Sequence, residues 1–105
     1  MQIINIDGFA RASSAVIVWP LVDEAGDPIA NVTAAKLWIG TVPAVELTLG
    51  AGLSFAAGDM SATLPSSQTE NFSGAITYEL WVQIGADKLA AVGGALNFIN
   101  TTGRI

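Results

Sequence analysis

The sequence predicts an all-β fold in which about seven or eight short strands form an antiparallel sandwich or small barrel. The clearest indication is the segment 76–84, Ile-Thr-Tyr-Glu-Leu-Trp-Val-Gln-Ile, in which every second residue is apolar or aromatic and points to one face. A period of two is typical of a strand with one buried face. Turn-forming residues also recur at intervals of about 8–12 residues, as in all-β domains, and helical periodicity is scarce.

The remaining strands are predicted between these turn signals. Pro20 cannot donate to a ladder, so its strand is expected at a sheet edge or at a bulge. The pair Gly93-Gly94 interrupts the last strand and marks a bulge or a close backbone approach. The polar segment 65–71 is expected to hold one helical turn, with Phe72 folding back as a plug. The further strands expected are 16–22, 35–40, 45–49, 53–55, 60–64, 89–92 and 95–99.

The chain of 105 residues is expected to form a single domain over 1–105, because this length is enough to close one core. Residues 1–12 are expected to be an N-terminal arm or edge strand, and residues 100–105 a C-terminal tail. The alternation predicts a core made by the inward residues Val16, Val18, Leu37, Ile39, Leu47, Leu64, Tyr78, Leu80, Val82, Leu96 and Phe98.

The composition indicates either a surface made mostly of small polar residues or an apolar surface that is partly covered by another protein chain, and the three tryptophans favour the second interpretation. Only 12% of residues are charged and 51% are hydrophobic, whereas charged residues make up about 25% of an average soluble domain. Large apolar surfaces on a folded protein mark interaction sites. We therefore expect a homo-oligomer, with a trimer favoured, or docking onto a different protein.

The charge distribution argues against nucleic-acid and membrane partners. The net charge is −5, and the four basic residues, Arg11, Lys36, Lys88 and Arg104, are scattered along the chain. Binding to phosphates or to an anionic membrane surface needs clustered cations. The N-terminus lacks the basic and apolar regions of a signal peptide, and no apolar run approaches the roughly 20 residues of a membrane-spanning helix. We expect no signal peptide and no membrane or nucleic-acid contact.

The sequence offers little for reaction chemistry. It contains neither histidine nor cysteine, which removes the usual nucleophile–base pairs and zinc sites. Asp23, Glu24 and Asp27 belong to one expected turn, while Glu46 and Glu79 lie at outward strand positions, so solvated carboxylates are expected. The sequence therefore predicts no catalytic residues, no cofactor and no metal site.

Trp38 and Trp81 are the candidate functional residues, because both lie at outward positions of alternating strands. If the two strands pair, the indole rings form a patch flanked by Lys36, Glu79 and Gln83. Tryptophan anchors many protein interfaces because it buries a large area. Two other interpretations stay open: a second internal layer or the N-terminal arm covers the rings, or the rings stack on sugar faces in a carbohydrate site.

The order of turn and strand motifs resembles a known family. A hydrophobic strand precedes an acidic turn, further strands follow at glycine and proline signals, and a glycine-containing strand closes the domain. These motifs are Asp23–Pro28, Ala34–Ile39, Leu47–Leu53, Ser61–Pro65, Gln68-Thr69, Gly74 to Leu80 and Gly94–Leu96. Over about residues 15–99 the chain resembles the small Ig-like β-sandwich domains of tailed-phage virion proteins, typified by the N-terminal domain of upper baseplate proteins.

The resemblance implies an antiparallel Ig-like β-sandwich and a non-enzymatic structural role in a bacteriophage virion assembled in the host cytoplasm. Other virion proteins would be the partners, and the domain would dock on the particle surface as a capsid decoration or as a tail or baseplate component. The family has no catalytic residues to transfer. The alternative from another functional class is a carbohydrate-binding module used in host adhesion.

Overall fold

The computed structural model describes residues 2–22, 25–29, 31–40, 45–56 and 58–99, and the predicted all-β fold is confirmed there. The predicted helical turn is present as a single turn of helix, α1 (Ser66–Thr69). The strands of the described residues are β1 (Gln2–Ile3), β2 (Ile6–Ala10), β3 (Ala15–Pro20), β4 (Val32–Ile39), β5 (Val45–Leu49), β6 (Gly52–Ala56), β7 (Asp59–Leu64), β8 (Gly74–Ile84) and β9 (Asp87–Ile99).

The strands form one curled sheet in the order β1-β9-β8-β4-β5-β6-β7-β3, with β2 also pairing with β9. The sheet is mixed, so the prediction of a purely antiparallel sheet is wrong in three places. Strands β1 and β2 run parallel to β9, and β5 runs parallel to β6. The first two follow because the N-terminal segment adds beside the last strand instead of forming a hairpin. The third is a short contact of two residue pairs, Thr48 with Gly52 and Leu49 with Leu53, where the chain turns and the Ala51 N–H donates to the Thr48 carbonyl at 2.8 Å.

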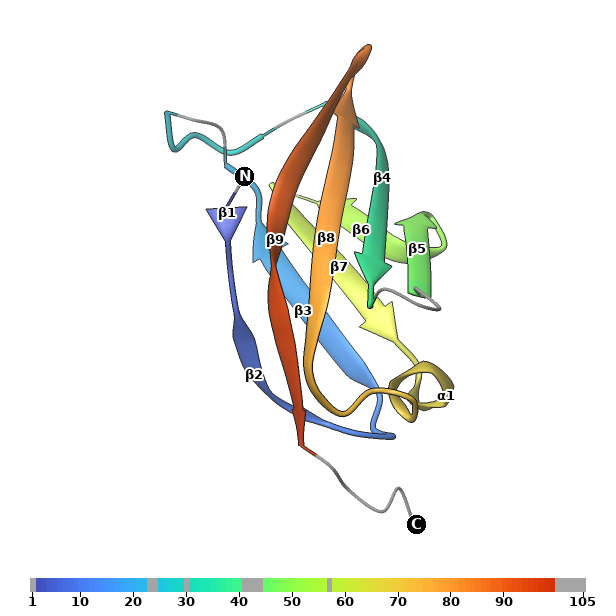
Figure 1. Ribbon diagram of the computed structural model, residues 1–105. Helices are drawn as coiled ribbons and strands as arrows, with labels where there is room; N and C mark the ends of the chain where they lie inside the picture. The colour runs from blue at the N-terminus through green and yellow to red at the C-terminus, as the bar shows by residue number, and fades with distance from the viewer. Residues whose placement is uncertain (1, 23–24, 30, 41–44, 57, 100–105) are drawn as a thin grey trace.

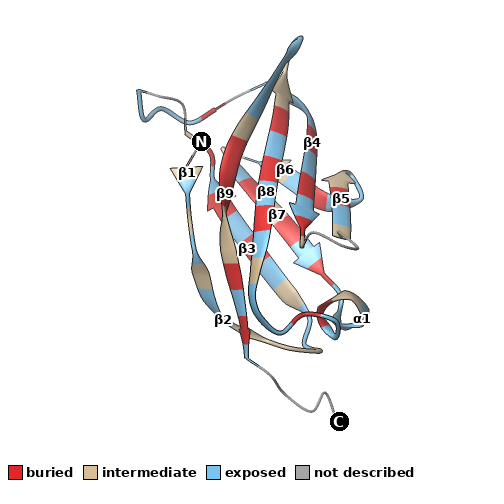
Figure 2. Ribbon diagram, in the orientation of Figure 1, coloured by how far each residue is buried: buried red, intermediate tan, exposed pale blue. Residues whose placement is uncertain are grey.

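The curl of the sheet creates two facing layers (Figure 1). Strands β9, β8 and β4 lie in front, and β3, β7 and β6 cross behind them. Buried and exposed residues alternate along the central strands β4 and β8, as Figure 2 shows, so one face of each layer forms the core. The opposite face of each layer points away from the core.

The predicted core is confirmed at nine positions and wrong at two. Val16 and Val18 are 65% and 53% exposed, and Ile17 and Trp19 are buried in their place. The cause is that residues 15–19 are all apolar, so polarity does not mark which side of this strand faces inward. The larger side chains, Ile17 and Trp19, take the inner side because they remove more apolar area from water.

A hydrogen-bonded relay joins the two layers at the centre of the core. The Trp19 Nε1–H in β3 donates to the Tyr78 hydroxyl in β8 at 3.0 Å, and that hydroxyl donates to the Ile4 carbonyl at 2.6 Å. The Trp19 and Tyr78 rings also pack with their centroids 5.4 Å apart. One hydroxyl therefore satisfies a polar group from the back layer and one from the N-terminal segment, as buried polar groups require.

The N-terminal segment lies against the middle of β9. The Ile4 N–H donates to the Gly93 carbonyl at 2.9 Å, and the Ala95 N–H donates to the Asn5 side-chain oxygen at 2.9 Å. A side chain on Gly94 would collide with the Ile4 carbonyl, which confirms the predicted close backbone approach. The expected interruption of β9 at this point is wrong, because β9 continues through both glycines.

A second contact cluster closes the lower end of the fold. The predicted plug is confirmed, because Phe72 is buried and its ring lies 5.2 Å from that of Phe98. Phe9 of β2 also stacks on Phe98, with the ring centroids 5.2 Å apart. Pro20 ends the edge strand β3, as expected of a residue that cannot donate. The expected tail 100–105 lies outside the described residues.

The relay predicts an alkaline limit to stability. Burial raises the pKa of the Tyr78 hydroxyl above its usual value, and the hydrogen bond from Trp19 opposes this only in part. Because the pKa of Tyr78 is higher in the folded than in the unfolded protein, its contribution to stability is fully present below the unfolded pKa of about 10. This contribution is lost as the pH rises through the folded pKa. Tyr78 is the single tyrosine of the chain, so near-ultraviolet tyrosinate absorbance reports it alone. We expect a higher titration midpoint in native protein than in denaturant, and equal midpoints would contradict this account.

Candidate functional site

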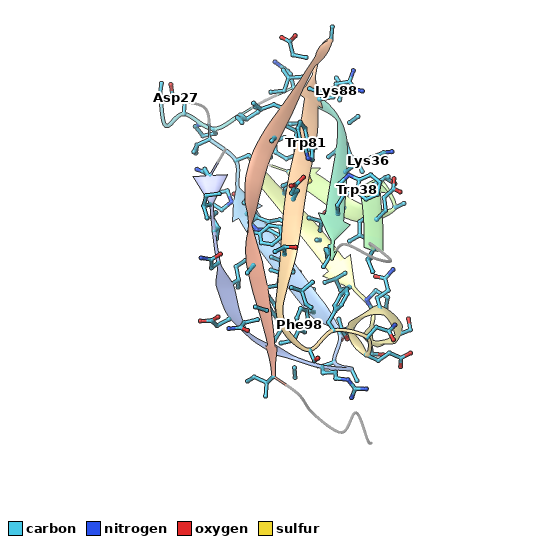
Figure 3. All side chains as sticks on the ribbon, viewed as in Figure 1. Asp27, Lys36, Trp38, Trp81, Lys88 and Phe98 are labelled. Atoms are coloured by element: carbon cyan, nitrogen blue, oxygen red, sulfur yellow. The ribbon has the colours of Figure 1, made fainter. Side chains whose placement is uncertain are left out.

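Strands β4 and β8 bring the two outward tryptophans together. In the antiparallel register Lys36 lies opposite Trp81 and Trp38 lies opposite Glu79, which makes the two indoles diagonal neighbours. Trp38 is 37% exposed and Trp81 39% exposed, so neither ring is a core residue. Both project from the front layer (Figure 3). We call the five residues Lys36, Trp38, Glu79, Trp81 and Gln83 the tryptophan face.

Hydrogen bonding holds the Trp81 ring in place. Its Nε1–H donates to the Glu79 carboxylate at 3.1 Å, between two residues on the same side of β8. At the other side of Trp81 along this strand, the Gln83 amide donates to the Gly85 carbonyl at 3.1 Å. The neighbours of the Trp81 ring are therefore fixed by contacts within the chain.

An ion pair supports the Trp38 ring. The Lys36 ammonium lies 3.0 Å from the Glu46 carboxylate, which belongs to the neighbouring strand β5. The same ammonium lies 5.7 Å from the centroid of the Trp38 ring, within the range of a cation–π contact. Because Glu46 also lies directly opposite Trp38, the carboxylate and the ring hold Lys36 from two sides.

A shallow hollow adjoins the two rings. Its volume is about 310 Å³, within the size range of small-ligand sites. It forms because the small residue Ala34 lies opposite Gln83 and leaves space between larger neighbours. The lining consists of Ala34, Ala35, Lys36, Trp38, Trp81, Val82, Gln83 and Lys88.

All five predicted site residues lie together, and the structure adds residues that the sequence interpretation did not include. Glu46 has the predicted outward orientation, but its contact with Lys36 depends on the pairing of β4 with β5, which periodicity does not determine. Lys88 could have been found, because the short turn after Ile84 pairs Gln83 with Lys88. Ala34 carries no signal in the sequence, since a hollow depends on the neighbours of a small residue.

The groups on the tryptophan face are suited to noncovalent contacts with a partner. It presents two aromatic rings, one amide, the Lys36 ammonium paired with Glu46, and the Glu79 carboxylate that accepts from Trp81. Among the described residues, no group of three or more histidine, cysteine, aspartate or glutamate side chains is placed to hold a metal ion. Likewise, the described part of the chain contains no helix with the length and apolar character needed to cross a membrane.

No protein-family model matches the chain, and no curated protein is significantly similar to it.

Tryptophan fluorescence distinguishes the face from the core. Replacing Trp38 and Trp81 by phenylalanine leaves Trp19 as the single tryptophan, which can be excited selectively over Tyr78, and Trp19 is fully buried. We expect iodide to quench the wild-type emission and to quench the double variant far less, because an ionic quencher cannot reach the core. Circular dichroism provides the control for folding. Equal quenching of the two proteins would show that the exposed rings are assigned to the wrong residues.

Proposed function

We propose that this chain is a non-enzymatic structural protein of a bacteriophage virion. It is a small Ig-like module that docks on the particle surface, as a capsid decoration or as a tail or baseplate component. The observation that carries the proposal is the tryptophan face: two partly exposed indole rings, held by internal contacts, on the outer side of a complete core.

The strand order supports the Ig-like part of the proposal. Variable-type Ig domains place strands G, F, C and C′ in one sheet and D, E and B in the other. In this chain β9-β8-β4-β5 and β6-β7-β3 follow the same order. Antibody domains join strands B and F by a buried disulfide, and here the Trp19–Tyr78 hydrogen bond joins the corresponding strands β3 and β8. The difference is that β5 pairs with β6, which makes one continuous mixed sheet.

The restricted orientation of the two tryptophan rings supports a docking role. Tryptophan is enriched among the residues that dominate interface energies. Ordering side chains at an interface costs about 0.5–1.5 kcal/mol for each immobilised flexible residue. Glu79 and Lys36 already restrict the rings of Trp81 and Trp38, so less freedom remains to be lost on binding.

The phage setting is supported by the turn and strand motifs over residues 15–99 and by the composition. A chain with 12% charged residues has few charges to solvate its surface, which suits a protein that functions while covered by neighbours. Other virion proteins are the partners that this proposal names.

A carbohydrate-binding module is the second candidate, because the hollow lies beside both rings. Aromatic faces next to an amide, as in Trp81 and Gln83, are the groups that a sugar site combines, and the volume of about 310 Å³ suits a small ligand. This candidate predicts that the rings contact a glycan instead of a protein.

Trp81→Ala tests the proposal. The ring lies outside the core, so we expect unfolding to change by less than about 1 kcal/mol, as for most surface substitutions. Incorporation into purified phage particles, quantified by mass spectrometry, should be lost, because interface anchors contribute about 2–4 kcal/mol. Ile99→Ala removes another exposed apolar side chain, 63% exposed against 39% for Trp81, at the far end of β9 and should incorporate normally.

The other results of this experiment are informative. Normal incorporation together with a large loss of thermal stability would contradict the proposal, because it would make Trp81 a structural residue. Normal incorporation together with loss of binding on a glycan array would favour the carbohydrate module.

A further inference from the structure

The sheet ends in two edges of unequal character. Strand β3 forms one end of the strand order and pairs only with β7 in the part of the chain that the structure describes. The N-terminal strands β1 and β2 form the other end, beside β9. Edge strands present unpaired N–H and C=O groups that can pair with another chain, and native proteins usually protect them.

The N-terminal edge carries several of the usual protective features. Strand β1 has two residues, and the pairing of β2 with β9 shifts register between Ile6 and Phe9. Gly8 has a φ of 96°, which bends the strand away from a regular extended form. Asp7 also places a charge there. Short length, irregular register and charge all disfavour pairing with another strand.

The β3 edge has almost none of these features. All six of its residues pair with β7 in unbroken register. No charged residue occurs from position 12 to position 22. Val16 and Val18 are among the most exposed large apolar side chains of the described chain, at 65% and 53%. A regular, uncharged, β-branched edge is the type that pairs with another strand.

The direction of the backbone groups follows from a neighbouring hydrogen bond. The Leu21 N–H donates to the Gly58 carbonyl, toward the β7 side, at 2.9 Å. Because successive residues of a strand direct their backbone groups to opposite sides, Val16, Val18 and Pro20 direct theirs to the open edge. Proline has no N–H, so its position at the end of the edge leaves no donor unpaired.

We propose that β3 pairs with β3 of a second copy of this chain, antiparallel and about a two-fold axis at Ile17. Val16 then lies opposite Val18 of the second copy, and each such pair exchanges two N–H···O bonds. The Ser14 N–H reaches the carbonyl of Pro20 in the second copy, and the missing donor of Pro20 ends the ladder on both sides. The two back layers become one continuous sheet.

A second copy fits this edge because the bonding pattern is self-complementary. Reversing the edge about Ile17 places donors opposite acceptors, as an isologous interface requires. Each copy carries a net charge of −5, yet positions 12–22 contain no charge, so no like charges meet along the shared strands. An antiparallel two-fold contact closes with two copies, which gives a dimer instead of the trimer expected from composition.

The interface is independent of the proposed docking function, because β3 and the tryptophan face belong to opposite layers of the fold. Dimerisation leaves both tryptophan faces uncovered by the β3 contact. Failure of one proposal therefore does not decide the other.

Disulfide trapping tests the register, because the chain has no cysteine of its own. The variants Val16→Cys and Val18→Cys are prepared separately, mixed, and oxidised mildly. Opposed residues of a bonded pair have Cα atoms about 5.5 Å apart, which suits a disulfide. Identical positions are diagonal, about 7–8 Å apart, which is too far. We expect the mixed disulfide to form several-fold faster than either homodisulfide, and equal or slower formation would overturn the proposal.

Sedimentation velocity tests the pairing without cross-links. Val18→Pro removes an outward N–H while leaving the β7 side intact, and it should sediment as a monomer where the wild type is a dimer. Val18→Thr keeps the N–H and the β-branched shape and should remain dimeric, which is the matched control. A wild-type monomer or trimer, or a dimeric Val18→Pro protein, would overturn the proposal. If Val18→Pro does not fold, the cysteine experiment takes its place as the deciding test.

Discussion

The fold depends on one buried hydroxyl. Tyr78 accepts a hydrogen bond from Trp19 and donates one to the Ile4 carbonyl, so a single side chain connects the back layer, the front layer and the N-terminal segment. Removing this hydroxyl would leave the buried Trp19 N–H unsatisfied, at a cost of about 1–3 kcal/mol, and would take a partner from the part-buried Ile4 carbonyl. This cost is a large share of the total stability of a domain, which is about 5–15 kcal/mol. The contact therefore couples the positions of all three parts.

The same contact determines which side chains face outward. Since Tyr78 and Trp19 point inward, the period of two directs Trp81 in β8 and Val16 and Val18 in β3 away from the core. A shift of one residue in either strand would exchange these sets and break the relay. The tryptophan face on the front layer and the apolar edge on the back layer are thus consequences of the same internal constraint, although they serve different proposed partners.

Where polar and apolar residues alternate, the sequence predicts the all-β class and the side of each strand that faces outward. In β4 and β8 the polar residues mark the outward side, and the five predicted residues of the tryptophan face lie together as expected. In β3 every residue from Ala15 to Trp19 is apolar, so alternation carries no information and the prediction places Val16 and Val18 on the wrong side. The parallel N-terminal strands and the contact between Lys36 and Glu46 depend on long-range pairing, which local periodicity does not encode.

Hydrogen exchange of Tyr78→Phe tests the central role of the relay most directly. The substitution keeps the ring and removes the hydroxyl that holds the Ile4 carbonyl. We expect faster exchange of the Ile4 and Ala95 amides, which bond to Gly93 and Asn5 at the N-terminal junction, while amides shared by β4 and β8 keep their protection. Unchanged protection at Ile4 and Ala95, or an even loss across all strands, would contradict it.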